Sequence, residues 1–355
     1  MSRCPQNPVG IVLFARDDGV CASVMDALRS IGVNAISLPI EEEWPADVET
    51  ILICGPFAPL SPAIYKIAQI TSPRVILWYT EQTPSPDIPN ALLRLGAGCS
   101  WCVNWIAEHL AQSAQLSSIQ NLVRRIHCLG TRLRLSGEIK WLDEQGYLKL
   151  LAVLTPSRQR YFAQKLGVPA RVIPYGYDKS FGEPLGLERD IDVVFLGSLR
   201  DRRRSRIISD LEQKLDRHRI KFVIKDGSPT RGYAFNEERT QLLNRAKIML
   251  NIMRQPWDDA VFRMLFAAPN GVMVISEPVV DISPFEPGKH FVVTSLEHMV
   301  ETIQYYLSHS QERESFAQNG YDLVVNQLTM EKMVGVLLSE GIGYGVNQIS
   351  TPSTW

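Results

Sequence analysis

The chain has 355 residues, of which 45% are hydrophobic and 21% are charged. This length suggests two domains that each bury a core, and the composition argues against a disordered, collagen-like or disulfide-scaffold protein. Lys and Arg (37) nearly balance Asp and Glu (38), so the chain as a whole does not attract nucleic acid. Any bound anion is therefore expected to be held by a local group of side chains.

Neither a membrane span nor a secretion signal is expected. No apolar run reaches the roughly 20 residues that a membrane-spanning helix needs, and the first residues lack the regions of a signal peptide. The six cysteines all lie at or before Cys128, and Cys99 and Cys102 have the spacing of a redox or metal pair without a second pair beside them. We expect a cytoplasmic protein with buried, reduced thiols and no metal site held by its side chains.

Short apolar or β-branched runs alternate with longer segments of helical period. This alternation is typical of βα units and predicts an α/β fold with mostly parallel sheets. The runs fall into an earlier and a later series, which predicts two sheets. The expected strands are 9–15, 34–38, 50–54, 74–79, 151–155 and 171–174 in the first series, and 191–197, 221–225, 248–252, 272–276 and 290–293 in the second.

The break between the two series lies in residues 174–186, where Gly and Pro interrupt both periods and indicate a loop. We place the domain boundary near residue 185, which gives a first domain of residues 1–184 and a second of residues 185–340. Residues 341–355 follow the last helical pattern and are expected to form a frayed tail.

The common glycine signatures of nucleotide-binding proteins are missing from the chain. No G-x-x-x-x-G-K-[ST] occurs, and the first strand runs into residues 14–19 without a G-x-G-x-x-G. These absences argue against a P-loop ATPase and against an ordinary dehydrogenase.

A group of arginines follows the first strand of the second domain, which ends at Gly197. Cations at a helix N-terminus oppose the helix dipole, and a bound anion would remove that conflict. Helix-start amides, guanidinium groups and the carboxyl end of a strand all suit a diphosphate. We therefore expect Gly197, Arg200 and Arg204 in a phosphate site, and the alternative is a solvated arginine-rich face. The full group is Arg200, Arg202, Arg203, Arg204 and Arg206.

Three more cations stand at or near the ends of neighbouring strands. Lys225 ends one strand, Arg254 follows the next, and Arg263 lies in the helical run after it. A surface position explains each of them alone, but together they predict a convergent positive cleft. Trp257, close to Arg254 in the sequence, would either stack on a base or sugar or anchor its loop by packing.

Two parts of the chain are similar to known glycosyltransferases. Residues 166–181, LGVPARVIPYGYDKSF, resemble the interdomain segment L-G-(V)…V-I-P-N-G-V-D…F of group 1 glycosyltransferases. Residues 262–277 and 285–293, FRMLFAAPNGVMVISE and FEPGKHFVV, resemble the spore-maturation-protein-like (CgeB-type) branch, whose pattern is R-x-F-E-A-x-A-x-G…(T/S)-(D/E)…F-E-P-G-K-(E/H)…V. The resemblance implies a GT-B fold, in which two Rossmann-like domains face a central cleft. It also implies that the second domain holds a sugar nucleotide, the first binds the acceptor, and the C-terminal helix crosses back to the first.

The resemblance includes a departure at two family glutamates, which fall on Asp258 and Phe266. The second glutamate accepts hydrogen bonds from the donor's ribose in the family, and a phenylalanine accepts none. Asp258 is kept as a donor-site residue, and Glu277 or Glu286 would take over the ribose. Otherwise the nucleotide is held differently, or transfer activity is lost.

Candidate bases in the first domain follow two of its strands. Asp17 and Asp18 come after the first strand, and Glu81 comes after the fourth. A carboxylate there would take a proton from an acceptor hydroxyl if burial raised its pKa toward neutrality. Because Asp17 and Asp18 also fit turn and cap chemistry, Glu81 is preferred. His109 lies in a helical segment, where packing explains a lone histidine, and ranks below Glu81.

Residues 121–141 carry five Arg or Lys against one Glu, with apolar residues between them. Such a segment would lie on an anionic membrane or receive a charged acceptor, or it would form an ordinary amphipathic helix with a basic outer face. Gly130 and Gly137 argue against a single long helix.

These features predict an enzyme, a hexosyltransferase that passes a sugar from a nucleotide-diphosphate donor to a hydroxyl of a glycan, lipid or small molecule. No cofactor and no nucleic-acid partner are expected. Two alternatives share the fold: a non-catalytic nucleotide-sugar-binding protein, favoured by Phe266, and a nucleotide-sugar epimerase, which needs no acceptor.

Overall fold

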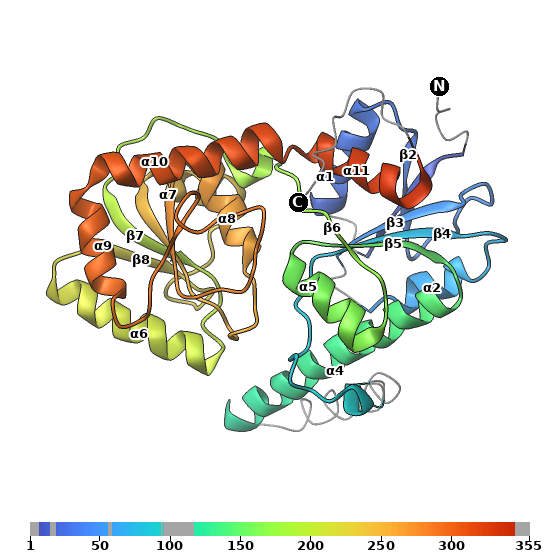
Figure 1. The fold of residues 1–355 in the computed structure, drawn as a ribbon, viewed down its shortest axis with the longest axis horizontal. Coiled ribbons are helices and arrows are strands. Elements are labelled where there is room, and N and C mark those ends of the chain that lie inside the picture. The colour runs from blue at the N-terminus through green and yellow to red at the C-terminus, as the bar shows by residue number, and fades with distance from the viewer. Residues whose placement is uncertain (1–6, 15–18, 56–58, 94, 96–116, 345–355) are drawn as a thin grey trace. The chain divides into compact units, whose positions relative to one another are not determined.

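The computed structural model describes residues 7–14, 19–55, 59–93, 95 and 117–344, with side chains left out at 19 and 117–128. The chain divides into two compact units (Figure 1). Unit 1 comprises Met1–Ile173 and Glu331–Thr354, and unit 2 comprises Pro174–Met330.

Unit 1 is built on a parallel sheet of six strands in the order β2-β1-β3-β4-β5-β6. Every residue of β3 is buried, because helices cover both faces of the sheet. In Figure 1, α2 (Ser61–Ile67), α4 (Ser117–Glu144) and α5 (Pro156–Tyr161) cover one face, and α1 (Gly19–Ser30) and α11 (Met330–Ile342) cover the other. The strands are β1 (Val9–Leu13), β2 (Ala35–Pro39), β3 (Thr50–Gly55), β4 (Arg74–Tyr79), β5 (Leu148–Val153) and β6 (Arg171–Val172).

Unit 2 has a parallel sheet of five strands in the order β11-β10-β9-β7-β8. Helices α6 (Arg202–Arg217) and α9 (Met299–Ser308) bury their apolar faces with Val193 and Phe195 of the sheet. Helices α7 (Asn236–Asn244), α8 (Val261–Ala267) and α10 (Ser310–Tyr321) cover the other face (Figure 1). The strands are β7 (Ile191–Leu196), β8 (Phe222–Lys225), β9 (Ala246–Asn251), β10 (Met273–Ser276) and β11 (Val292–Val293).

Every strand expected from the sequence is present, and the two series form two separate parallel sheets. The predicted α/β class is therefore confirmed. The ends of the strands differ by a few residues. Strand β5, for example, begins at Leu148 and not at residue 151, because the exposed Lys149 interrupts the apolar run between Leu148 and Leu150.

The chain passes from unit 1 to unit 2 between Ile173 and Pro174, which is earlier in the sequence than the boundary expected near residue 185. The Gly- and Pro-rich segment after Pro174 packs on unit 2 and does not act as a free linker. The amide of Tyr177 donates to the carbonyl oxygen of Leu328 at 2.6 Å, and the Tyr175 ring lies 5.5 Å from that of Phe262. These contacts are long-range in sequence, so local composition does not reveal them.

Helix α11 returns the chain to unit 1. A Cβ on Gly341 would lie 2.6 Å from Cδ1 of Ile76 in β4, so the helix backbone lies directly on the sheet. Glu340 also pairs with Arg171 at 3.7 Å. Residues 331–340, which the sequence analysis grouped with the second domain, therefore belong to unit 1, in keeping with the crossing helix that the resemblance implied.

Helix α4 runs unbroken from Ser117 to Glu144, so the expectation that Gly130 and Gly137 would interrupt it is wrong. Leu133, Ile139 and Leu142 bury one side of this helix in the core of unit 1. Such packing outweighs the roughly 1 kcal/mol that each glycine costs in a helix. In the described part of the chain, no helix combines the length and apolar character needed to cross a membrane.

Candidate functional site

Gly197 follows β7 at the carboxyl edge of the unit 2 sheet. Its φ of +146° is a conformation that glycine adopts readily and other residues do not. Its amide donates to the carbonyl oxygen of Lys225 at 3.0 Å, which extends the pairing of β7 with β8. A Cβ at this position would lie 2.8 Å from Nη2 of Arg263 and 3.5 Å from Nη1 of Arg204. Two guanidinium groups therefore converge on the bare backbone of Gly197.

Arg263 reaches this point from α8 and is held by three neighbours. Its Nε donates to the carbonyl oxygen of Leu196 at 3.0 Å, and its Nη1 donates to Oδ1 of Asn251 at 2.9 Å. The guanidinium carbon lies 5.2 Å from the centre of the Phe195 ring. The side chain is 8% exposed, and its Nη2 has no hydrogen-bond partner among the described residues. The arginine is therefore fixed in place with one donor group to spare.

Arg204 comes from the first turn of α6 and is 2% exposed. Asp201 caps that helix by accepting hydrogen bonds from the amides of Arg203 and Arg204 at 3.0 and 3.1 Å. The Nη1 of Arg204 donates to the carbonyl oxygen of Ser198 at 3.3 Å, and the guanidinium shares the Phe195 ring with Arg263. Within the described part of the chain, its Nε is buried without a hydrogen-bond partner.

The electrostatics of the pair favour a bound anion. Burial lowers the pKa of Arg204 to about 8, helped by Arg263 and Arg254 and opposed by Asp258 and Asp201. Burial also lowers the pKa of Arg263 to about 10, where Asp258 again opposes the shift. Neither arginine forms an ion pair with a carboxylate among the described residues. Two buried cations with spare donors would be stabilised by a negatively charged ligand.

Arg203 and Glu277 form a structural ion pair beside this site. Nη1 of Arg203 donates to Oε1 of Glu277 at 2.9 Å, and Nη2 contacts Oε2. The same Oε1 accepts from the amide of Met253 at 2.7 Å, and Glu277 is buried. The carboxylate that the sequence analysis assigned to donor binding therefore ties the start of α6 to the ends of β9 and β10.

The remaining cations expected at the site differ in their exposure and in their partners. Arg200 is exposed, and Arg254 is exposed but close enough to lower the pKa of both buried arginines. The side chain of Lys225 pairs with Glu238 at 3.0 Å. The predicted donor-site residues that the structure brings together are Gly197, Arg204, Arg254, Asp258 and Arg263.

The side chain of Phe266 lies in an aromatic cluster. Its ring lies 5.2 Å from that of Phe181 and 6.1 Å from that of Phe262, and the guanidinium carbon of Arg239 lies 4.1 Å from its centre. Position 266 thus helps to hold the segment after Pro174 on α8. Its apolar contacts give a physical reason for the aromatic side chain.

Three further residues named from the sequence, Asp258, Glu286 and Trp257, differ in burial and surroundings. Asp258 is buried and favours the charged forms of both arginines. Glu286 is exposed and bonded to Lys289, which holds the pKa of the Glu286 carboxyl below its usual value. Trp257 is half-buried. Their roles at a donor site stay predictions.

In unit 1 the structure describes Glu81 but not the other candidate bases. Glu81 is half-buried and follows β4. Burial raises the pKa of the Tyr79 hydroxyl, and the nearby Glu81 carboxylate raises the same pKa further. Asp17, Asp18 and His109 lie outside the described residues and stay predictions. The described residues hold no group of three or more His, Cys, Asp or Glu arranged to bind a metal ion.

In the basic segment 121–141, the cations whose side chains the structure describes form contacts within unit 1. Arg132 donates to the side chain of Gln82, Arg134 pairs with Glu138 at 3.0 Å, and Nζ of Lys140 donates to the carbonyl oxygen of Leu166 at 3.2 Å. These contacts fit an amphipathic helix packed on its own unit. A membrane contact of this segment stays a prediction.

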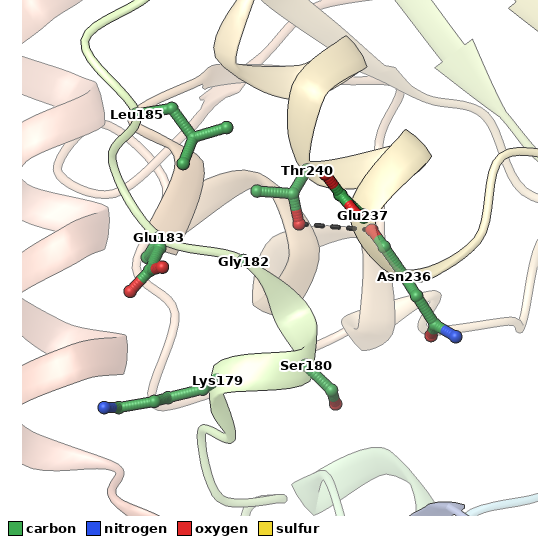
Figure 2. Close-up of a pocket in the computed structure, with 8 residues that line it drawn as sticks. All are labelled: Lys179, Ser180, Gly182, Glu183, Leu185, Asn236, Glu237 and Thr240. Carbon is green, nitrogen blue, oxygen red and sulfur yellow. Dashed lines mark hydrogen bonds between the residues drawn. The ribbon is translucent and has the colours of Figure 1, made fainter.

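A shallow pocket of about 320 Å³ lies elsewhere in unit 2 (Figure 2). Figure 2 shows the segment from Lys179 to Leu185 beside the first turns of α7, where the hydroxyl of Thr240 donates to the carbonyl oxygen of Asn236 at 3.2 Å. The pocket shares no residue with the pair of buried arginines. Its lining residues are Lys179, Ser180, Gly182, Glu183, Leu185, Asn236, Glu237 and Thr240.

Residues 198–339 match a family described as glycosyl transferase-like. The match begins directly after Gly197 and includes Arg204 and Arg263. Most of the second unit is therefore similar to a glycosyl transferase-like domain. The prediction of a glycosyltransferase is confirmed, whereas the match does not identify a branch of the family. A search of the curated proteins found no match to the chain.

Solved structures of glycosyltransferases share the fold. Sucrose-phosphate synthase from Thermosynechococcus elongatus aligns with a TM-score of 0.56 at 13% identity, over 96% of this chain and 98% of its own. A glycosyltransferase from Rickettsia africae ESF-5 aligns with a TM-score of 0.50 at 10% identity, over 95% and 99%. TarM aligns with a TM-score of 0.54 at 12% identity, over 82% of this chain, which spans only 54% of TarM. At these identities the likeness shows the fold, and the predicted GT-B class is confirmed.

Proposed function

We propose that the protein transfers a sugar from a nucleoside-diphosphate sugar to an acceptor hydroxyl, and that Arg204 and Arg263 hold the diphosphate above Gly197. The observation that carries the proposal is the pair of buried guanidinium groups, which have donors to spare and no carboxylate partner in the described part of the chain. Both arginines lie within the segment that matches a glycosyl transferase-like family, which supports this ligand.

The two arginines suit a leaving diphosphate. When the bond between the sugar and the diphosphate breaks, negative charge grows on the departing oxygen. Arg263 is fixed by Leu196, Asn251 and Phe195, so it needs no rearrangement to stabilise that charge. Such preorganised donors in a site with little water commonly supply a large part of the catalytic effect.

Glu81 is the proposed general base. It would take the proton of the acceptor hydroxyl as that oxygen bonds to the sugar. Its half-buried position after β4 supports this role. We also propose that the chain belongs to the spore-maturation-protein-like branch, on the pattern of residues 262–293. A cytoplasmic location is proposed on the composition of the chain.

Two other functions would use the same diphosphate site. A non-catalytic binding protein would bind a nucleotide sugar without turnover, and an epimerase would convert it without an acceptor. The aromatic packing of Phe266 is the observation that favours the first of these. Products formed with and without an added acceptor separate all three functions.

Substitution of Arg263 tests the proposal. Arg263→Gln should weaken the binding of UDP or GDP, whichever the wild type binds, by about 10- to 150-fold, because a charge-assisted hydrogen bond contributes roughly 1.5 to 3 kcal/mol. Arg206→Gln is the matched control, since Arg206 is exposed on α6. Calorimetry on folded variants gives both affinities. An affinity of Arg263→Gln within about twofold of the wild type contradicts the proposal.

A further inference from the structure

A second group of charged and polar side chains surrounds the end of β4 in unit 1. Tyr79 is the last residue of that strand, and its buried hydroxyl donates to the carbonyl oxygen of Gln82 at 3.1 Å. Arg158, Glu81 and Arg132 lie close enough to act electrostatically on this hydroxyl. We call Tyr79, Glu81, Arg132 and Arg158 the Tyr79 cluster.

Three neighbouring elements deliver the members of the Tyr79 cluster to one edge of the sheet. Strands β4 and β5 pair in parallel with Tyr79 opposite Val153, so α5 begins beside the end of β4. Thr155 caps α5 and accepts from the amide of Arg158 at 3.4 Å, which fixes the start of that helix. Arg132 arrives from α4 and bonds to the side chain of Gln82. Each arginine is thus positioned by a separate packed helix.

Both arginines and the carboxylate of the Tyr79 cluster act on the Tyr79 hydroxyl. Burial raises the pKa of Tyr79, Arg158 and Arg132 lower it, and Glu81 raises it. Two guanidinium groups and one carboxylate therefore act on the same point, and Arg158 is only 6% exposed. Next to Tyr79, Thr80 is also 6% exposed, and its hydroxyl has no hydrogen-bond partner in the described part of unit 1.

We propose that Arg132 and Arg158 bind an oxyanion, a phosphate or carboxylate group of the acceptor, and hold it beside Glu81. Guanidinium groups present paired donors that match the oxygens of either anion. The acceptor is then an anionic molecule, whose charged group is bound while a separate hydroxyl meets the base. The identification of the ligand as an acceptor rests on the proposed transferase function, whereas the anion site itself does not.

Hydrogen exchange of the full-length protein tests this site at the level of segments. Inorganic phosphate and acetate are the two probes, and the one that slows exchange identifies the preferred anion. The expected result is slower exchange of amides in residues 80–83 and 156–160. Protection of these segments by neither probe would overturn the proposal.

Matched variants connect the protection to the named arginines. Arg132→Gln, at a half-buried position, should require about tenfold more anion for the same protection, as expected for a lost charge-assisted contact. Arg160→Gln removes an exposed arginine of the same helix α5 and should leave the protection unchanged. Arg158→Gln should lose the protection if the variant folds. Unchanged protection in Arg132→Gln would refute the assignment.

The same experiment separates this inference from the proposed function. UDP or GDP should slow exchange around residues 197–204 in unit 2, with or without Arg132. If neither nucleotide protects that segment but the oxyanion still protects residues 80–83, the donor site fails and the anion site stands. The reverse pattern keeps the donor site and removes the anionic acceptor.

Discussion

At the scale of single residues, the site depends on the absence of a side chain at Gly197. A side chain there would meet Arg263 at 2.8 Å, and the φ of +146° would strain any other residue. The ring of Phe195 lies beneath both guanidinium groups, at 5.2 Å from Arg263 and 5.8 Å from Arg204. An aromatic ring attracts cations but adds no negative charge, so Phe195 holds the arginines without neutralising them.

The lowered pKa of Arg204 predicts a pH dependence of UDP binding. Burial and the like charges of Arg263 and Arg254 bring this pKa to about 8, against the opposing effect of Asp258 and Asp201, and a bound diphosphate would raise it. Below this pH the free protein already carries the proton. Above it, binding must take a proton up, so the affinity should fall by up to about tenfold per pH unit.

Calorimetry measures this dependence directly. In the wild type, two buffers of different ionisation enthalpy should report net proton uptake at about pH 9 and less at about pH 7.5, where the terminal phosphate of UDP is already largely ionised. Arg204→Gln should bind more weakly and show a smaller dependence on pH in this range. A wild-type affinity that does not change between these two pH values contradicts the role assigned to Arg204.

Sequence reasoning named some of these residues but not all of the contacts that position them. Arg204 and Arg263 were expected because strand ends and cations are visible in the sequence. The pairing of Arg203 with Glu277 was not expected, since it follows from the order of β7, β9 and β10 in the sheet. The burial of Arg204 among its exposed neighbours depends on which face of α6 packs on the sheet.

At the scale of elements, α8 and the segment after Pro174 are joined by aromatic packing. Phe181 lies against Phe266, and Tyr175 lies against Phe262. The carbonyl oxygen of Phe181 also accepts a hydrogen bond from the buried Asn270 at 3.0 Å. The segment therefore has a fixed place on unit 2, although its Gly and Pro content predicts a loop.

Truncation of Phe266 tests this packing. Phe266→Ala should reduce the free energy of unfolding by about 1 to 3 kcal/mol, less than for a fully buried ring, because Phe266 is half-buried. The matched control is Phe235→Ala, since Phe235 is 63% exposed and its removal should cost about 0.5 kcal/mol or less. Chemical denaturation measures both. Equal stabilities of Phe266→Ala and wild type would mean that the ring contacts do not hold the segment.

The strands were easier to predict than the helices and the boundary. Buried parallel strands such as β3 and β4 are continuous apolar runs, which the sequence shows without reference to the fold. Helix α4 continues through Gly130 and Gly137 because of contacts made far along the chain. The return of α11 to unit 1 is likewise a tertiary contact, and the resemblance implied it where periodicity did not.

At the scale of the whole molecule, each unit has its own parallel sheet and its own group of buried or half-buried arginines. In unit 2 the group lies at the end of β7, and in unit 1 it lies at the end of β4. The carboxyl ends of parallel strands are where α/β proteins generally bind ligands. A near-neutral chain thus carries two local groups of arginines, which its overall charge does not reveal.

A crystal structure of the protein soaked with UDP or GDP tests the central claim most directly. The account predicts phosphate oxygens within hydrogen-bonding distance of Nη2 of Arg263 and of the Arg204 guanidinium, above the backbone of Gly197. A nucleotide whose phosphates lie elsewhere, for example in the pocket beside α7 that Figure 2 shows, would contradict it.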